Sequence, residues 1–134
     1  VKSLAKSRRP GERLEALKAM GRNGTEVEAI VALADDKFFD VRKQVCNELA
    51  NFTALVAIET LGRRLKIDSN IGVRLEASKS LGKTGDRAAI PPLIECLSYQ
   101  NFDLAENCMR SLTAITGADL GLDPEAWKGW LKNR

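Results

Sequence analysis

An internal repeat limits the folds that this sequence can adopt. A pattern that begins with arginine and places apolar or small residues three and seven positions later starts at Arg13, Arg42 and Arg74. A degenerate copy starts at Ala105, and the four starts are separated by 29, 32 and 31 residues. Apolar residues spaced by three and four mark the buried face of a helix. Each copy leads through a turn into a second apolar helical pattern, so we predict helical hairpins that stack into an α-solenoid.

The predicted fold is an all-α, right-handed α-solenoid that forms one domain over residues 1–134. The expected repeats are approximately 10–38, 39–69, 70–101 and 102–134, behind a basic leading segment at 1–9. Thr25 and Glu26 belong to a predicted capping box that starts a second helix. The three phenylalanines of the turns between repeats are expected to fill the core there; they are Phe38, Phe39 and Phe102.

Composition restricts the chemistry. The 134 residues include no histidine, which excludes histidine-based catalytic triads and histidine-ligated zinc. The net charge of +3 argues against a dedicated nucleic-acid-binding domain. We therefore expect no catalytic site, no metal site and no cofactor.

The three cysteines predict no disulfide framework, because their number is odd in an ordinary globular composition. Cys46, Cys96 and Cys108 are interpreted as small buried apolar side chains. Free thiols are typical of a reducing compartment. No signal peptide or membrane-spanning run is visible, so we predict a cytoplasmic location with no membrane association. Because the chain begins at Val1, it is also interpreted as a possible fragment of a longer protein.

Charged residues recur at the same positions of successive repeats. Arg42 and Arg74 occupy one register position, and the turns nearby carry Asp40 and Asp68. We predict that these four residues form a structural ladder of ion pairs. The alternative is a row of arginines that binds anions.

The middle repeats carry a family resemblance. Asp40-Val41-Arg42 and the run from Gly72 to Ile94 are similar to the D-x-x-V-R … L-G-D-x-x-A-I-P-x-L pattern of HEAT repeats, in the short form named for the phycobilin lyases. This resemblance covers nearly the whole chain. It implies that the second helix of each hairpin lines a concave face.

The end of the chain resembles the closing segment of many bacterial HEAT-like proteins, which has an Asp-Pro-x-x-Trp-x-x-Trp form. Asp123 is the expected N-cap, followed by a proline at the first helical position. Trp127 and Trp130 share one face of the helix that follows. We predict that this helix covers the exposed apolar edge of the last repeat, the alternative being an aromatic surface that contacts a ligand.

The function that these patterns favour is a non-catalytic, protein-binding scaffold whose partner is another protein. The residues proposed to contact the partner on the concave face are Glu59, Arg63, Arg64, Lys66, Arg87, Glu95 and Tyr99. Two alternatives stay open. One is an accessory subunit of a tetrapyrrole (bilin) lyase, by analogy with the namesake of the repeat; the other is nucleic-acid binding through basic helices.

Overall fold

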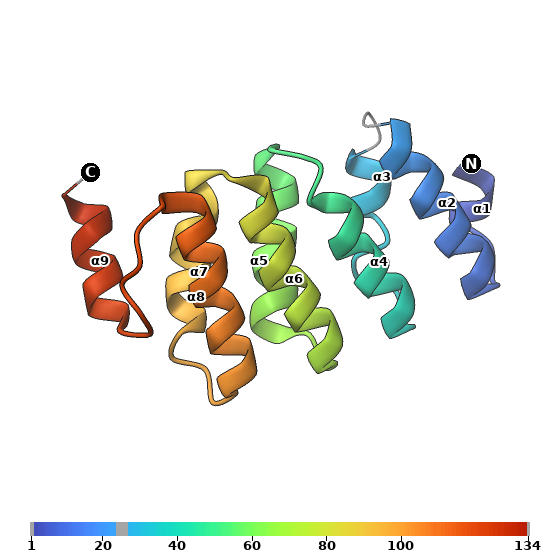
Figure 1. Ribbon diagram of the computed structural model, residues 1–134. Helices are drawn as coiled ribbons and strands as arrows, with labels where there is room; N and C mark the ends of the chain where they lie inside the picture. The colour runs from blue at the N-terminus through green and yellow to red at the C-terminus, as the bar shows by residue number, and fades with distance from the viewer. Residues whose placement is uncertain (1, 24–26, 134) are drawn as a thin grey trace.

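The chain folds into an α-solenoid of helical hairpins, as the repeat predicts (Figure 1). The structure is a computed structural model that describes residues 2–23 and 27–133, so the predicted capping box at Thr25 and Glu26 lies outside the described residues. A short helix, α1 (Lys2–Ala5), packs against the first hairpin. The hairpins pair α2 (Pro10–Asn23) with α3 (Val27–Val31), α4 (Phe39–Leu49) with α5 (Leu55–Ile67), α6 (Ile71–Thr84) with α7 (Ile90–Cys96), and α8 (Phe102–Thr116) with α9 (Pro124–Lys132). A 3₁₀ turn, η1 (Arg87–Ala89), leads into α7.

The hairpins stack so that the helices form two layers (Figure 1). The first helices, α2, α4, α6 and α8, contact one another in sequence along one layer. The second helices, α3, α5, α7 and α9, do the same along the other layer. No strand occurs among the described residues, and none of the helices there is long and apolar enough to cross a membrane.

The apolar core lies between the two layers, where the repeat register predicts it. The residues one position before, three after and seven after each repeat start face inward in the three later repeats. They are Val41, Val45, Leu49, Val73, Ala77, Leu81, Leu104, Cys108 and Leu112, and each is fully buried. Burying these side chains removes apolar surface from water in every repeat, which is the main stabilising contribution in such a stack.

Small residues set the close approach of α6 and α8. The Ser111 hydroxyl on α8 donates a hydrogen bond to the carbonyl oxygen of Ser78 on α6, at 2.7 Å. A Cβ atom at Gly82 would lie 2.8 Å from the Ser111 Cβ and 3.0 Å from its Cα. Because the backbone of α8 cannot yield easily, glycine is required at this crossing.

Asparagine and glycine define the ends of these two helices. The side chains of Asn70 and Asn101 accept hydrogen bonds from the backbone N–H groups of Val73 and Leu104, which caps the first turns of α6 and α8. Gly85 and Gly117 follow the last turns with φ of 65° and 77°, a left-handed conformation that glycine adopts without a steric penalty.

The turns between repeats differ from the sequence prediction in one respect. Phe38, Phe39 and Phe102 are exposed, with Phe102 64% accessible, so the expectation that they fill the core is wrong. Phe39 and Phe102 are the first residues of α4 and α8, two positions before the buried Val41 and Leu104. Two residues correspond to about 200° of helical rotation, so the rings point outward.

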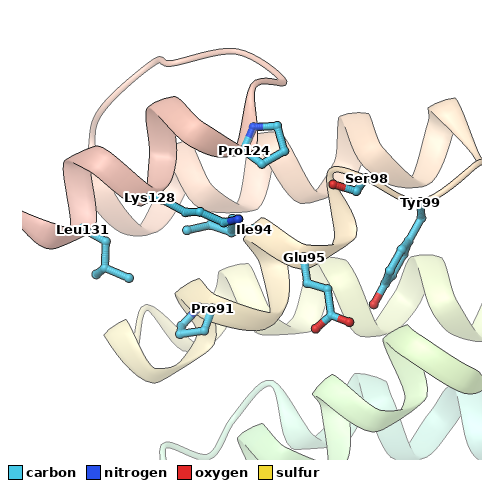
Figure 2. Close-up of a pocket in the computed structure, with 8 residues that line it drawn as sticks. All are labelled: Pro91, Ile94, Glu95, Ser98, Tyr99, Pro124, Lys128 and Leu131. Atoms are coloured by element: carbon cyan, nitrogen blue, oxygen red, sulfur yellow. The ribbon is translucent and has the colours of Figure 1, made fainter.

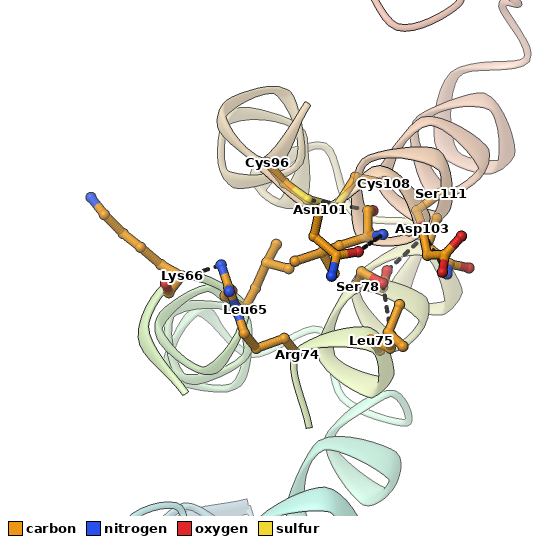
Figure 3. Close-up of a disulfide and its surroundings, with 12 residues drawn as sticks. Leu65, Lys66, Arg74, Leu75, Ser78, Cys96, Asn101, Asp103, Cys108 and Ser111 are labelled. Carbon is orange, nitrogen blue, oxygen red and sulfur yellow. Dashed lines mark hydrogen bonds between the residues drawn. A yellow bond between two sulfur atoms is a disulfide. The ribbon is translucent and has the colours of Figure 1, made fainter. Parts of the chain in front are cut away.

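The cysteines also differ from the prediction. Cys96 at the end of α7 and Cys108 on α8 form a disulfide, with their Cα atoms 6.3 Å apart, and Cys46 alone is free (Figure 3). All three cysteines are buried, as predicted. The expectation that none of them forms a disulfide is wrong, because an odd number of cysteines does not exclude one bonded pair. The disulfide also removes the basis, three free thiols, on which a reducing compartment was predicted.

This pairing predicts a specific thiol titration. We expect one thiol per chain to react with a thiol reagent in the unfolded, unreduced protein, and three after reduction. In the native state Cys46 should stay unreactive at pH 8, because burial, with a contribution from Asp68, raises the pKa of its thiol to about 12. Reduction should lower the free energy of unfolding by about 2–3 kcal/mol, since the bridge closes a short loop. Three reactive thiols before reduction would contradict the pairing.

The C-terminal helix, α9, packs against α7 at the end of the stack. Trp127 on α9 is fully buried, and its indole N–H donates to the carbonyl oxygen of Gly121 at 2.7 Å. Trp130 is half-buried against the same core. Asp123 precedes the helix and accepts a hydrogen bond from the Glu125 N–H at 3.0 Å, and Pro124 occupies the first helical position. The helix therefore covers the apolar end of the stack.

Candidate binding face and arginine ladder

Arginines at the repeat start pair with aspartates in the turn that follows the same hairpin. Arg13 binds Asp36 through two nitrogens, with Nε–Oδ2 and Nη2–Oδ1 distances of 2.6 and 3.0 Å. Arg42 binds Asp68 in the same way, at 2.9 and 3.1 Å. Two parallel bonds between a planar guanidinium and a carboxylate make a strong and directional pair. Arg42 also donates to the carbonyl oxygen of Asp36, which links the two rungs.

Asp68 is the centre of the ladder. Its side chain is fully buried and accepts hydrogen bonds from Arg42, from Arg64 at 3.2 Å and from the backbone N–H of Asn70 at 2.9 Å. Burial by itself would raise the pKa of Asp68, but these bonds outweigh it and hold the pKa below its ordinary value. The bond to Asp68 correspondingly raises the pKa of Arg42.

Arg64 is not on the surface, so its place among the predicted contact residues is wrong. It is only 6% exposed, and its guanidinium spans Asp68 and, at 3.1 Å, Asp35. Arg64 lies three residues after the buried Leu61, on the face of α5 that turns toward the core. Its Nε is a buried donor without a hydrogen-bond partner.

The other two predicted ladder residues do not form ion pairs within the described part of the chain. Asp40 is exposed in the first turn of α4. Arg74 donates from Nε to the carbonyl oxygen of Leu65 at 2.8 Å instead of binding a carboxylate. Arg13 was not among the predicted ladder residues, but it belongs to the ladder through its pair with Asp36. The sequence contained a signal for this, because Arg13 occupies the same repeat position as Arg42.

The outer surface of the second-helix layer, here called the second-helix face, carries two adjoining grooves. The α5–α7 groove has a volume of about 530 Å³. Its lining comprises Leu55, Ile58, Glu59, Gly62, Arg63, Lys66, Ile67, Ala88, Pro92 and Glu95. Leu55 and Ile67, at opposite ends of α5, are 64% and 52% exposed. Large apolar side chains left in solvent beside charged ones are typical of an interaction surface.

The α7–α9 groove lies on the other side of α7 and has a volume of about 510 Å³ (Figure 2). Pro91, Ile94, Glu95 and Ser98 line it from α7 and the turn after it, together with Tyr99, and Pro124, Lys128 and Leu131 line it from α9. Glu95 borders both grooves. The two grooves therefore form one continuous face across α5, α7 and α9.

Charged groups on this face are partly paired. Lys66 on α5 and Glu95 on α7 form an exposed ion pair at 3.0 Å, and the bond to Glu95 raises the pKa of Lys66. The guanidinium of Arg87 lies 5.5 Å from the centre of the Trp130 ring. Glu59 and Arg63 are exposed in the α5–α7 groove. Six of the predicted contact residues thus lie on or beside the second-helix face, and Arg64 does not.

Sequence reasoning missed the apolar part of the face, above all Leu55, Ile67 and the prolines of α7. A signal was present, because Leu55, Glu59, Gly62 and Lys66 fall on the side of α5 opposite the buried Ala57, Leu61 and Leu65. Within the described residues, no group of cysteine, aspartate and glutamate side chains is placed to hold a metal ion.

Comparison with known families agrees with the architecture. The family model described as HEAT repeats matches residues 27–113, which is more than half of the chain and spans α3 to the last turn of α8. No curated protein sequence matches the chain. With its stacked hairpins, its two helical layers and this match, the chain belongs to the HEAT-repeat family.

Proposed function

We propose that this chain is a non-catalytic module that binds a partner protein across the second-helix face. The observation that carries the proposal is the pair of continuous grooves on either side of α7, which combine exposed apolar and charged side chains. We expect this face to be the concave one, and the repeats to be of the short, phycobilin-lyase type. HEAT repeats commonly act as scaffolds for protein interactions, which supports the proposal.

The chemistry of the grooves favours a partner segment that is both apolar and charged. Leu55 and Ile67 offer apolar anchors at the two ends of α5, and Arg63 and Glu59 lie between them. Gly62 leaves space at the bottom of the α5–α7 groove, because it has no side chain. A Cβ atom there would lie 3.5 Å from the Pro92 Cβ, in van der Waals contact, and would fill part of that space. A few such anchors supply most of the binding energy in typical protein interfaces.

The proposal predicts that charge reversal in the groove weakens partner binding. Arg63→Glu should reduce recovery of captured partner proteins at least about tenfold, because the new charge repels the matching acidic group of the partner and leaves it unpaired. Lys79→Glu is the matched control: Lys79 is an exposed cation on α6, in the first-helix layer. The measurement is quantitative mass spectrometry after affinity capture with each variant.

Unequal recovery by the two variants, with the loss confined to Arg63→Glu, supports the second-helix face. Equal recovery by both variants and the wild type would overturn it, and a loss confined to Lys79→Glu would assign binding to the opposite layer. Arg64 is not used in this test, because reversing a buried charge that binds Asp68 would disrupt the fold itself.

A further inference from the structure

The ladder has one position at which a tyrosine replaces the aspartate. In the two complete rungs, the aspartate stands two residues before the N-cap of the next first helix: Asp36 before Phe38, and Asp68 before Asn70. The N-cap of α8 is Asn101, so the equivalent residue in the third rung is Tyr99. Arg74, which occupies the register position of Arg42, therefore meets an aromatic ring where the earlier arginines meet a carboxylate.

The contacts of Arg74 leave part of its guanidinium available. Its Cζ lies 5.2 Å from the centre of the Tyr99 ring, and its Nε donates to the carbonyl oxygen of Leu65 (Figure 3). Its Nη2 reaches the carbonyl oxygen of Lys66 only at 3.4 Å. No acceptor within residues 2–23 and 27–133 binds its Nη1. The two terminal nitrogens can thus receive a carboxylate end-on while Nε keeps its backbone bond.

A depression of about 570 Å³ opens beside this arginine. We call it the open rung; its lining residues are Lys66, Arg74, Ser98, Tyr99, Gln100 and Asn101. The charged side chains of the lining are both cations. The side-chain oxygen of Asn101 already accepts the Leu104 N–H at 2.9 Å, so its NH₂ group remains to donate. The site therefore offers mainly hydrogen-bond donors.

We propose that the open rung binds a carboxylate of an acidic peptide segment, which pairs end-on with Nη1 and Nη2 of Arg74, whereas Asp36 and Asp68 pair with Nε and Nη2 of their arginines. The inference rests on the proposed function, since the partner supplies the segment, and it adds the chemical character of that partner. Pairing of a guanidinium with a carboxylate in a fork is the interaction this chain already uses twice.

The surroundings favour a carboxylate over a phosphate. Lys66, the second cation of the site, already binds Glu95 at 3.0 Å. The negative charge of Glu95 close by opposes the two charges of one compact phosphate dianion more strongly than the single charge of one side-chain carboxylate in the site. The remaining donors are neutral hydroxyl and amide groups, which suit a single carboxylate.

The test uses a capped tetraglutamate peptide as the probe and a capped tetraglutamine peptide as its neutral match. Each is titrated into the whole ¹⁵N-labelled chain while the Nε–Hε signal of Arg74 is followed by NMR, and inorganic phosphate forms a third arm. We expect a saturable shift with tetraglutamate, none with tetraglutamine, and a smaller response to phosphate. A response to tetraglutamine equal to that of tetraglutamate, or a stronger one to phosphate, would overturn the proposal.

Tyr99→Asp is the decisive variant, because it provides the missing carboxylate from within the chain. We expect it to close the rung, to weaken tetraglutamate binding at least about tenfold and to leave the fold intact. Tyr99→Asn has the same shape without the charge and should still bind. Retained binding in Tyr99→Asp, or equal loss in both variants, would contradict a carboxylate site.

The two proposals can fail separately. If Arg63→Glu loses captured partners while Tyr99→Asp binds tetraglutamate like the wild type, the open rung is wrong and the binding face stands. If tetraglutamate binds as described but Arg63→Glu captures the same partners as the wild type, the open rung stands and the second-helix face is wrong.

Discussion

Replacing Asp68 with alanine is expected to lower the free energy of unfolding by about 3–5 kcal/mol, because it leaves buried cations without their counter-charge. Asp68 is the common acceptor for Arg42 and Arg64, and both arginine side chains are largely buried. Asp68 also accepts a hydrogen bond from the backbone N–H of Asn70, the N-cap residue of α6, and so holds the turn that leads into this helix. The loss should appear as a lower urea midpoint in far-ultraviolet circular dichroism.

Asp40→Ala is the control for this prediction. Asp40 is an exposed aspartate of the same repeat and makes no ion pair within the described part of the chain, so its removal should change stability by less than about 0.5 kcal/mol. Similar losses for Asp40→Ala and Asp68→Ala would show that the ladder does not stabilise the fold.

Asp68 also makes the stability depend on pH. The pKa of Asp68 is lower in the folded protein than its ordinary value of 3.8, so the folded state binds fewer protons there than the unfolded state. The stabilisation is therefore complete above that value and is lost as the pH falls through the folded pKa. Asp68→Asn should lack this acid-dependent component.

Replacing Trp127 with alanine is expected to cost about 3–5 kcal/mol, the range for removing a large aromatic side chain from a core. Trp127 on α9 is fully buried, and its indole N–H donates a hydrogen bond to the Gly121 carbonyl oxygen. Its loss exposes the apolar end of the stack, and a solenoid without a covered end unfolds from that end. Amide hydrogen exchange should show faster exchange in α8 and α9 before the rest of the chain.

Trp130→Ala is the matched control, since it removes the same side chain from the same helix at a half-buried position. We expect less than half of the loss, because less apolar surface leaves water at this position. An equal loss for both variants would mean that the helix as a whole, and not the buried indole, covers the end.

The repeat register predicted the helices well because it reports a local property, the spacing of apolar side chains around a helix. Val45, Ala77 and Leu81 are buried where the spacing of three and seven places them. The same reasoning failed at Phe39 and Phe102, where an apolar residue stands just before the inward-facing position. Hydrophobicity alone does not say on which side of a first turn a ring will point.

The candidate site was predicted less completely, because partner choice is a tertiary property. Arg63 and Arg64 are neighbours of the same type, yet one lines a groove and the other is enclosed by Asp35 and Asp68 from two different turns. The helical period places Arg63 and Arg64 on different sides of α5. It does not predict that Arg64 is buried, because this depends on the carboxylates of Asp35 and Asp68, which lie outside the helix.

The all-α class and the inward register of the core are evident from the amino-acid order, because they follow from the spacing of apolar residues along a helix. The hairpin period is evident too, because the arginine-led pattern recurs after 29 and 32 residues. Three pairings become visible only when the helices are packed together: Cys96 with Cys108, Asp68 with two arginines, and Arg74 with Tyr99 in place of a carboxylate. Those pairings depend on how the two helices of a hairpin pack together and, for the disulfide, on how one hairpin stacks on the next. Arg42 and Asp68, Arg74 and Tyr99, and Cys96 and Cys108 are 12 to 26 residues apart, and no periodicity within a single helix specifies their contacts.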